Sequence, residues 1–338
     1  MTSDNTIRDS FTASAHPLRA VVARCRLALR RPPFYNLPMA LPQTQRILVL
    51  ANPKSGFQWS FDEMRRAFDK SWDVPGIDLS YQFCQSAQDG MDKARRAVER
   101  GVTCILVAGG DGTVSTVGRA LIGTDVALGM IPAGSGNGFA RHFGIPLAPA
   151  KAVESLAHAS VRPIDVGMID ETPFLVTCSM AWDASIAKSF AKSPIRGIVP
   201  YVFAGVQELF GFEAQDISVV LDGEEELTFA APMVFTVANL SQYGGGAQIA
   251  PHARADDGYL ELVVALRQDI AKLIANIGRL FDGSMHKNPE VISRQFRTMT
   301  VKRQRASALQ IDGELVEAAT EVTVRVIPKA LNVLVPEE

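Results

Sequence analysis

Strand-like apolar runs alternate with helix-like segments over residues 45–165, and a glycine-rich turn directly follows each of three runs. The runs are short and apolar throughout, as in strands buried on both faces, and the segments between them place apolar residues at helical spacing. This alternation predicts a doubly wound α/β domain with a parallel sheet. Because ligands of such sheets gather at the carboxyl ends of the strands, we expect the three turns to lie together on one edge.

The three turns read NPKSG, GGDGT and PAGSGNGFAR, and a fourth motif, IDGE, lies near the C-terminal end. Glycine turns expose backbone N–H groups and let phosphate oxygens approach closely, while GGDGT and IDGE also carry carboxylates. Phosphate cradles combined with carboxylates indicate phosphoryl transfer. Each turn taken singly is more simply explained as an ordinary tight turn, and none fits the Walker or the dinucleotide-binding pattern.

Residues 166–329 have a different pattern, in which strand-like runs dominate and turns such as Asp222-Gly223 separate them. Runs of this kind predict an antiparallel β domain, most simply a sandwich. One continuous strand is expected at 227–240. Two amphipathic helices are expected at 196–212 and 268–282, where apolar residues recur at helical spacing.

Taken together, these motifs resemble the diacylglycerol kinase catalytic-domain family, which includes bacterial lipid kinases and sphingosine kinases. GGDGT is shared with NAD kinases and phosphofructokinases, but its combination with PAGSGN, DGE and the APHARADDGYL stretch at 250–260 is specific. The resemblance begins at about Arg46 and runs to the C-terminus. It implies transfer of the γ-phosphoryl group of ATP to the hydroxyl of a membrane lipid. It also implies that residues 330–338 return as a strand to the first domain, and that the active cleft lies between the two domains.

The resemblance assigns roles by position in the motifs. The residues it places around the nucleotide are Asn52, Pro53, Lys54, Ser55, Gly56, Gly109, Gly110, Gly112, Thr113, Gly134, Ser135, Gly136, Asp312 and Gly313. Gly110 and Gly112 are expected in conformations or close approaches that a Cβ would block. Glu314 matches the general base of bacterial members, whereas sphingosine kinases assign that role to the aspartate matching Asp111, and both assignments stay open.

The resemblance also implies a structural Mg²⁺ site, with Asp257 as a ligand and the backbone carbonyls of Arg254 and Tyr259 as its neighbours. The chain departs from many members at Ser115 and Thr116, where they have Asn-Glu, so the lipid acceptor stays open. Three other readings compete with a lipid kinase: an NAD kinase-like enzyme, a kinase of a soluble polyol, and an inactive lipid-binding module.

Composition narrows the class of protein. At 338 residues and 47% hydrophobic content, the chain suits two domains with real cores. A net charge of −2 gives no reason to expect nucleic acid, and four widely spaced cysteines point to a reducing cytoplasm. No run of 18 apolar residues is present, so we expect a cytoplasmic protein in peripheral contact with the membrane. The sequence leaves the oligomeric state open, and a homodimer is among the alternatives.

Several basic residues allow two interpretations each. Residues 1–44 are expected to be a disordered extension, and Met39 is a plausible start; the arginine-rich stretch 19–31 could instead lie on an anionic membrane. The run Lys302, Arg303 and Arg305 is interpreted as a solvated strand edge, with a lipid headgroup contact as the alternative. On the third turn, His142 is expected to be solvated.

Overall fold

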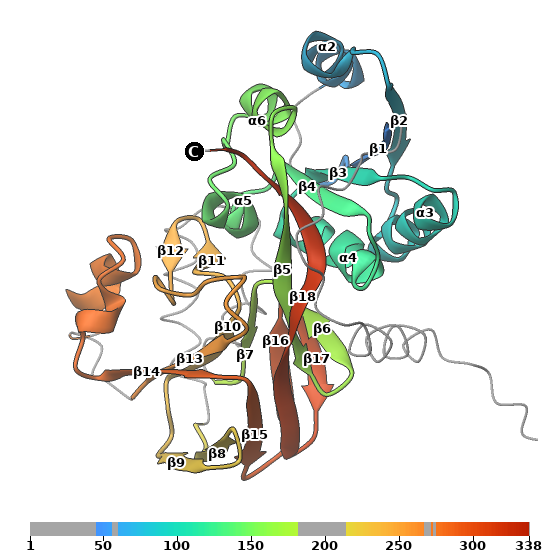
Figure 1. The fold of residues 1–338 in the computed structure, drawn as a ribbon. Helices are drawn as coiled ribbons and strands as arrows, with labels where there is room; N and C mark the ends of the chain where they lie inside the picture. The colour runs from blue at the N-terminus through green and yellow to red at the C-terminus, as the bar shows by residue number, and fades with distance from the viewer. Residues whose placement is uncertain (1–44, 56–59, 182–213, 267–271, 273–274, 338) are drawn as a thin grey trace, which may run out of the picture.

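The computed structural model describes residues 45–55, 60–181, 214–266, 272 and 275–337 (Figure 1). It has two parts, an α/β half built on parallel strands and a β half in which antiparallel sheets pack against each other. The predicted fold class is therefore confirmed. The two parts are joined through one continuous ten-stranded sheet.

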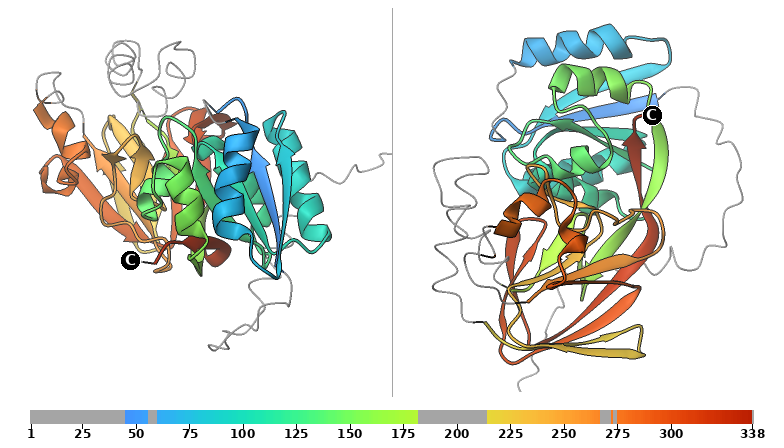
Figure 2. Two further views of the ribbon diagram at one scale, coloured as in Figure 1. Left: turned by 90° about the horizontal axis from the view of Figure 1, so that it is seen from above. Right: turned by 90° about the vertical axis from the view of Figure 1, so that its left-hand side faces the viewer.

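The α/β half is organised around parallel strands in the order β2-β1-β3-β4. These strands are β1 (Gln45–Ala51), β2 (Ile77–Phe83), β3 (Cys104–Gly109) and β4 (Ala127–Pro132). Every residue of β3 and β4 is buried, as the continuous apolar runs predicted, because helices cover both faces. The covering helices are α2 (Phe61–Trp72) and α6 (Pro149–Leu156) on one face, with α3 (Ala87–Glu99) and α4 (Asp111–Leu121) on the other (Figure 2).

Local sequence explains why the covering helices begin where they do. At α2, the Ser60 side chain accepts the backbone N–H of Glu63, and the Glu63 carboxylate accepts the N–H of Ser60. This reciprocal cap satisfies two donors that the first helical turn leaves free. Met64, Phe68 and Trp72 recur every four residues and form the buried stripe of the helix.

The strand β18 (Glu321–Val335) connects the two halves. Near its end, Asn332 and Val333 pair in parallel with β4, whereas its first five residues pair antiparallel with β15 (Thr298–Arg303). The strand β5 (Ser160–Ile169) follows β18 along most of its length, and the register shifts between Ile327 and Leu331. A bulge of this kind bends a strand, which lets one strand serve both halves.

The β half contains a six-stranded antiparallel sheet in the order β14-β13-β10-β7-β16-β17. Its strands are β7 (Thr177–Ser179), β10 (Val234–Ala238), β13 (Leu260–Ala265), β14 (Val291–Phe296), β16 (Ser307–Ile311) and β17 (Glu314–Ala318). The long sheet contributes β15, β8 (Ile217–Leu221) and β9 (Glu225–Phe229), and β6 (Thr172–Phe174) pairs with β5. One apolar cluster, including Phe174, Phe235 and Phe296, is shared by residues of both sheets.

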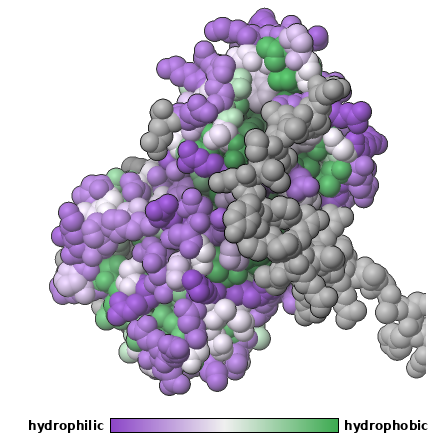
Figure 3. All heavy atoms as spheres, in the orientation of Figure 1, coloured by the Kyte–Doolittle hydropathy of each residue, from purple (hydrophilic) through white to green (hydrophobic). Residues whose placement is uncertain are grey.

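The remaining described elements are short. They are α5 (Gly138–His142), the ribbon of β11 (Gln242–Gly244) and β12 (Ala247–Gln248), and the 3₁₀ turns η1 (Ile277–Leu280) and η2 (Met285–Lys287). No helix of the described part is long and apolar enough to cross a membrane. In Figure 3 the β half shows mostly hydrophilic side chains, with apolar ones in small separate groups.

Some sequence expectations need correction. The single strand expected at 227–240 is two strands, β9 and β10, because a turn with Ala231 at φ 44° separates them. The run at 302–305 does not form a solvated strand edge. Its strand β15 is paired on both sides, and Arg303 is only 5% exposed and donates to the carbonyl of Ser307. The helix expected at 196–212 and the stretch 19–31 lie outside the described residues, as do residues 268–271, 273 and 274 of the helix expected at 268–282. The described end of that segment includes the 3₁₀ turn η1.

Candidate active site

The second glycine turn links β3 to α4, and Asp111 is the first residue of the helix. The N-cap residue is Gly110, so no side chain caps the first turn. The first N–H groups of a helix lack intrahelical partners and lie at the positive end of its dipole. Helix α4 thus begins with donors suited to a phosphate group.

Asp111 is held in place by the third glycine turn. Its Oδ2 accepts the N–H of Gly138 at 3.0 Å, and its Oδ1 accepts the N–H of Phe139 at 3.0 Å. Burial raises the pKa of Asp111, these N–H donors oppose the rise, and the negative charge of Asp312 adds to it. A carboxylate has about four acceptor positions, more than these donors fill, so Asp111 can still accept a proton or contact a cation.

The third turn is fixed by Asn137, which adopts a left-handed conformation with φ 51°. Its side chain accepts the N–H of Gly134 at 3.1 Å and donates to the Gly134 carbonyl at 2.8 Å. Gly134 also touches the second turn, because a Cβ placed on it would lie 2.7 Å from the Cα of Gly110. Both positions therefore require glycine if the two backbones are to approach this closely.

The first turn lies beside the second. The Asn52 side chain donates to Thr113 Oγ1 at 2.9 Å, and Ser55 Oγ lies 3.4 Å from the same oxygen. Lys54 Nζ donates to the carbonyl of Gln85, which follows β2, at 3.2 Å. The three glycine turns thus gather at the carboxyl ends of β1, β3 and β4, as the alternating pattern predicted.

A glycine turn of the β half closes over the third turn. Gly244, Gly245 and Gly246 all have positive φ, at 122°, 63° and 91°, which is a backbone that other residues rarely adopt. The N–H of Gly245 donates to the Gly136 carbonyl at 2.8 Å. A Cβ on Gly138 would lie only 3.0 Å from the Gly244 nitrogen, so the two chains are in direct backbone contact.

His142 strengthens this contact. Its Nδ1 accepts the backbone N–H of Ser241 at 3.1 Å and lies 2.9 Å from Ser241 Oγ. Burial lowers the pKa of His142 to about 4, with Asp256 acting weakly in the other direction, so the ring is neutral near pH 7. The prediction of a solvated histidine is wrong, because the ring is partly buried and packs edge-on against Phe143.

The DGE motif reaches the same place from the β half. Asp312 accepts the backbone N–H groups of residues 175, 176 and 177 and the hydroxyl of Ser115 on α4. Its side chain is 1% exposed, and its backbone is left-handed at φ 48°. Asp312 therefore connects the DGE turn to α4 through a buried and fully bonded carboxylate.

Glu314 begins the edge strand β17, and its side chain is 51% exposed. Its Oε2 lies 3.3 Å from Nη1 of Arg119, which comes from α4 and is only 15% exposed. Nη2 of Arg119 lies 3.7 Å from Oδ2 of Asp312. The arrangement places an accessible carboxylate beside the last turn of α4, the helix that begins at Asp111.

The proposed Mg²⁺ residues lie on the turn before β13. Asp257 Oδ1 accepts the N–H of Tyr259 at 3.0 Å, and Arg254 pairs with Asp256 at 3.5 Å. The turn is anchored by the buried Asp165, which accepts the N–H of Gly258. One carboxylate with backbone carbonyls is the hard oxygen set that Mg²⁺ takes together with water. Within the described ranges, no group of three or more His, Cys, Asp or Glu side chains could hold a metal ion.

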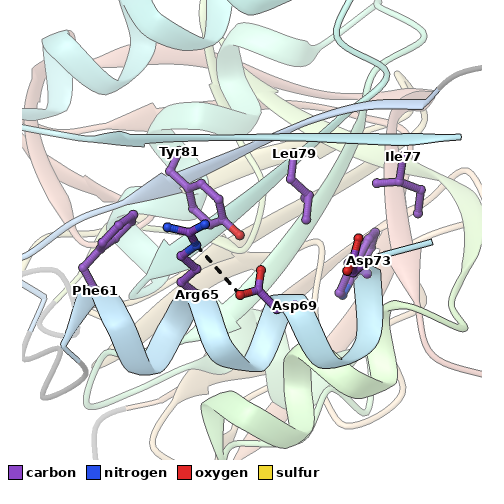
Figure 4. A pocket seen from close by; sticks show the side chains of 8 residues that line it. Phe61, Arg65, Asp69, Asp73, Ile77, Leu79 and Tyr81 are labelled. Carbon is purple, nitrogen blue, oxygen red and sulfur yellow. Dashed lines mark ion pairs between the residues drawn. The ribbon is translucent and has the colours of Figure 1, made fainter. Parts of the chain in front are cut away.

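A separate groove of about 390 Å³ lies between α2 and β2 (Figure 4). Phe61, Tyr81 and Leu79 line it, and the Arg65–Asp69 ion pair, at 3.8 Å, crosses its side. It contains none of the motif residues and lies at the β2 edge of the sheet. We therefore place the candidate site at the glycine turns instead.

The structure brings most of the sequence-predicted residues together, and one of them, Gly112, differs from expectation. A Cβ on Gly112 would meet no atom within 4 Å, and its φ is not positive, so the expectation of blocked space is wrong for contacts within the protein. Gly56 lies outside the described residues. Sequence reasoning missed Arg119, since a lone arginine on a helix gives no signal of the two acidic partners that the fold brings to it.

Comparison with known proteins gives a consistent match over both halves. The model of the "Diacylglycerol kinase catalytic domain" matches residues 46–169, and that of the "YegS C-terminal NAD kinase beta sandwich-like domain" matches residues 177–335. A protein from Mycobacterium tuberculosis named "Diacylglycerol kinase" is 28% identical over 86% of this chain and 95% of its own length. One from Chromohalobacter salexigens, named "Probable lipid kinase YegS-like", is 30% identical over 64% of this chain and 70% of its own length.

The fold is also that of a solved structure. A diacylglycerol kinase from Bacillus anthracis superimposes with a TM-score of 0.67 over 87% of this chain and 98% of its own, at 18% identity. At 18% identity, this similarity shows a shared fold and nothing more. It covers both the parallel-sheet half and the β sandwich.

Proposed function

Because this chain belongs to the diacylglycerol kinase catalytic-domain family, we propose that it transfers the γ-phosphoryl group of ATP to the hydroxyl of a membrane lipid. One observation carries the proposal. Helix α4 carries the uncapped donors and Asp111 at its start, and near its other end Arg119 contacts the exposed carboxylate of Glu314 from the β half. Phosphate-binding donors and a candidate proton acceptor thus lie along one helix, at its start and beside its last turn.

The donor set fits the phosphates of ATP. Free N–H groups at the start of α4, the amide of Asn52 and the hydroxyls of Ser55 and Thr113 lie on neighbouring turns. Such groups bind phosphate oxygens without a Walker motif. Magnesium, when bound with the nucleotide, would neutralise charge that develops on the phosphates. The lone pairs that Asp111 keeps free fit that cation.

The reaction requires a proton acceptor for the lipid hydroxyl. In our proposal, Glu314 takes this proton as the hydroxyl oxygen forms its bond to the γ-phosphorus, and the bond from that phosphorus to the bridging oxygen of ADP breaks. Asp111 orients the phosphate end of the site through its fixed carboxylate. Asp312 holds the turn that carries Glu314 and makes no direct contact with the reacting atoms.

The surroundings of Glu314 support a lipid acceptor. Leu315 and Val316 follow it on the edge strand β17 and are 40% and 36% exposed. Adjacent exposed apolar side chains are uncommon on an edge strand, where charged residues usually prevent pairing. Because successive side chains of a strand point to opposite faces, Val316 lies on the face of Glu314, and we propose that it meets the acyl part of the lipid as the protein docks peripherally.

The test is a phosphotransfer assay with radiolabelled ATP and a panel of acceptors. The panel contains diacylglycerol, monoacylglycerol, sphingosine, ceramide and phosphatidylglycerol, together with NAD and glycerol as soluble acceptors. We expect labelled product from at least one lipid and none from NAD or glycerol. Labelling of NAD or glycerol alone would replace the lipid kinase with a kinase of a soluble acceptor, and no transfer with intact lipid binding would indicate an inactive module.

A further inference from the structure

The guanidinium of Arg119 lies between the two acidic residues of the DGE motif. Nη1 is 3.3 Å from Glu314 and Nη2 is 3.7 Å from Asp312, and the side chain is 15% exposed. Nε and Nη2 are buried without a hydrogen-bond partner. Burial of an arginine side chain without a full set of hydrogen bonds destabilises the folded protein. The presence of Arg119 at this position therefore needs an explanation.

Stabilising Asp312 does not explain it. The Asp312 carboxylate already accepts four hydrogen bonds, from three backbone N–H groups and the Ser115 hydroxyl, and its side chain is 1% exposed. The Nη2–Oδ2 distance of 3.7 Å is longer than a hydrogen bond. The closer contact of the guanidinium is therefore with Glu314.

Without this contact, the side chain of Glu314 would not be held in one conformation. It is half exposed, it stands two residues from the negative Asp312, and an exposed glutamate samples several rotamers. Arg119 stands on the same face of α4 as Asp111 and Ser115, since the three residues are spaced by four. The helix that carries Asp111 at its start thus also carries the cation that meets Glu314.

We propose that Arg119 is a positioning residue that holds the Glu314 carboxylate in reach of the lipid hydroxyl. This inference rests on the proposed function, because it requires Glu314 to act as the proton acceptor. Asp312 fixes the backbone of the turn, and Arg119 fixes the side chain that projects from it. Arg119 acts only through Glu314, so its removal has no consequence for turnover once Glu314 is gone.

A double-mutant cycle tests this relation. Arg119→Met removes the charge and keeps a long side chain, Arg119→Lys keeps the charge, and Glu314→Gln removes the acceptor. Each arginine variant is made alone and together with Glu314→Gln. Arg95→Met is the matched control, because Arg95 lies on the neighbouring helix α3 in a surface pair with Asp92. Turnover of the best lipid acceptor, the KM for ATP and unfolding in urea are measured for all variants.

We expect Arg119→Met to lower kcat roughly 10- to 100-fold, as for a misplaced catalytic group, with the KM for ATP unchanged. In the Glu314→Gln background the same substitution should not lower kcat further, and Arg119→Lys should restore part of the loss. An equal loss in both backgrounds, or an unchanged kcat, would overturn the inference while leaving the proposed function intact. Normal turnover of Glu314→Gln would also overturn the inference, because Glu314 would not be the proton acceptor, whereas absence of lipid turnover in the wild type would overturn the proposed function.

Discussion

The GGDGT turn and the DGE turn each hold an aspartate that accepts backbone N–H groups, but the two carboxylates are used differently. Asp111 accepts two such groups and remains partly exposed, whereas Asp312 accepts three and a hydroxyl and is buried. On the α/β side the anchored residue itself faces the site. On the β side anchoring and chemistry are separated, and the exposed carboxylate is that of Glu314, two residues further on.

The two halves are held to one site by different kinds of contact. On the α/β side the turns follow neighbouring strands of one sheet, and close backbone contact at Gly110 and Gly134 joins two of them. The β side approaches from a different sheet, and a buried carboxylate that bonds to both α4 and the strand region near β7 is needed to fix it. The following predictions test that contrast.

The largest effect on stability is expected at the buried aspartate. Asp312→Asn keeps the shape but places an NH₂ group against backbone N–H donors and leaves Arg119 with less compensation for its charge. Removing one partner from such a buried network costs about 3 kcal/mol of the free energy of unfolding. Urea unfolding measures it, with Glu314→Gln as the exposed control. Equal stability of the two variants would show that Asp312 does not anchor the turn.

Two alanine substitutions test the α/β side with opposite signs. In Gly134→Ala the new Cβ meets the backbone of Gly110, and such overpacking costs about 1–3 kcal/mol. Gly112 lies within helix α4, where alanine is favoured over glycine, and a Cβ there would meet no neighbouring atom. We therefore expect Gly112→Ala to raise the free energy of unfolding by about 0.5 kcal/mol. Calorimetry should nevertheless show weaker ATP binding for Gly112→Ala. Unchanged ATP affinity would remove this residue from the phosphate site.

The smallest effect concerns the contact that closes the β half over the third turn. Because the pKa of His142 is lowered to about 4 in the folded protein, the unfolded chain binds the extra proton between pH 6.5 and 4. The contribution of the neutral His142 ring to the free energy of unfolding is present above pH 6.5 and is lost as the pH falls through this window. His142→Gln should reduce the change in the free energy of unfolding across this pH window by on the order of 1 kcal/mol. Parallel stability curves for variant and wild type would contradict the role of the buried ring.

The sequence predicts the α/β half closely because its signals are local. The apolar run of β1 and the spacing of Met64 and Phe68 on α2 report burial directly. In the β half the local signal is weaker. The strands β16 and β17 carry exposed or mixed residues that do not form an apolar run, and neither was expected as a strand.

Within the site, sequence indicated which turns gather but not what holds them. Ser115 and Asp312 are 197 residues apart, so no periodicity connects them. Asn137 was predictable only as part of a glycine turn, and its left-handed backbone emerges from contacts with Gly134. Side-chain to backbone bonds across domains follow from the fold and leave no spacing in the chain.

The most direct test of the account is the turnover of Glu314→Gln with the best lipid acceptor. Because the substitution preserves size and polarity and removes only the proton acceptor, we expect kcat to fall roughly 10²- to 10⁴-fold. ATP affinity and unfolding in urea should stay close to wild type, since Asp312 keeps the turn in place. Near-normal turnover would contradict the account and transfer the role of the base to Asp111.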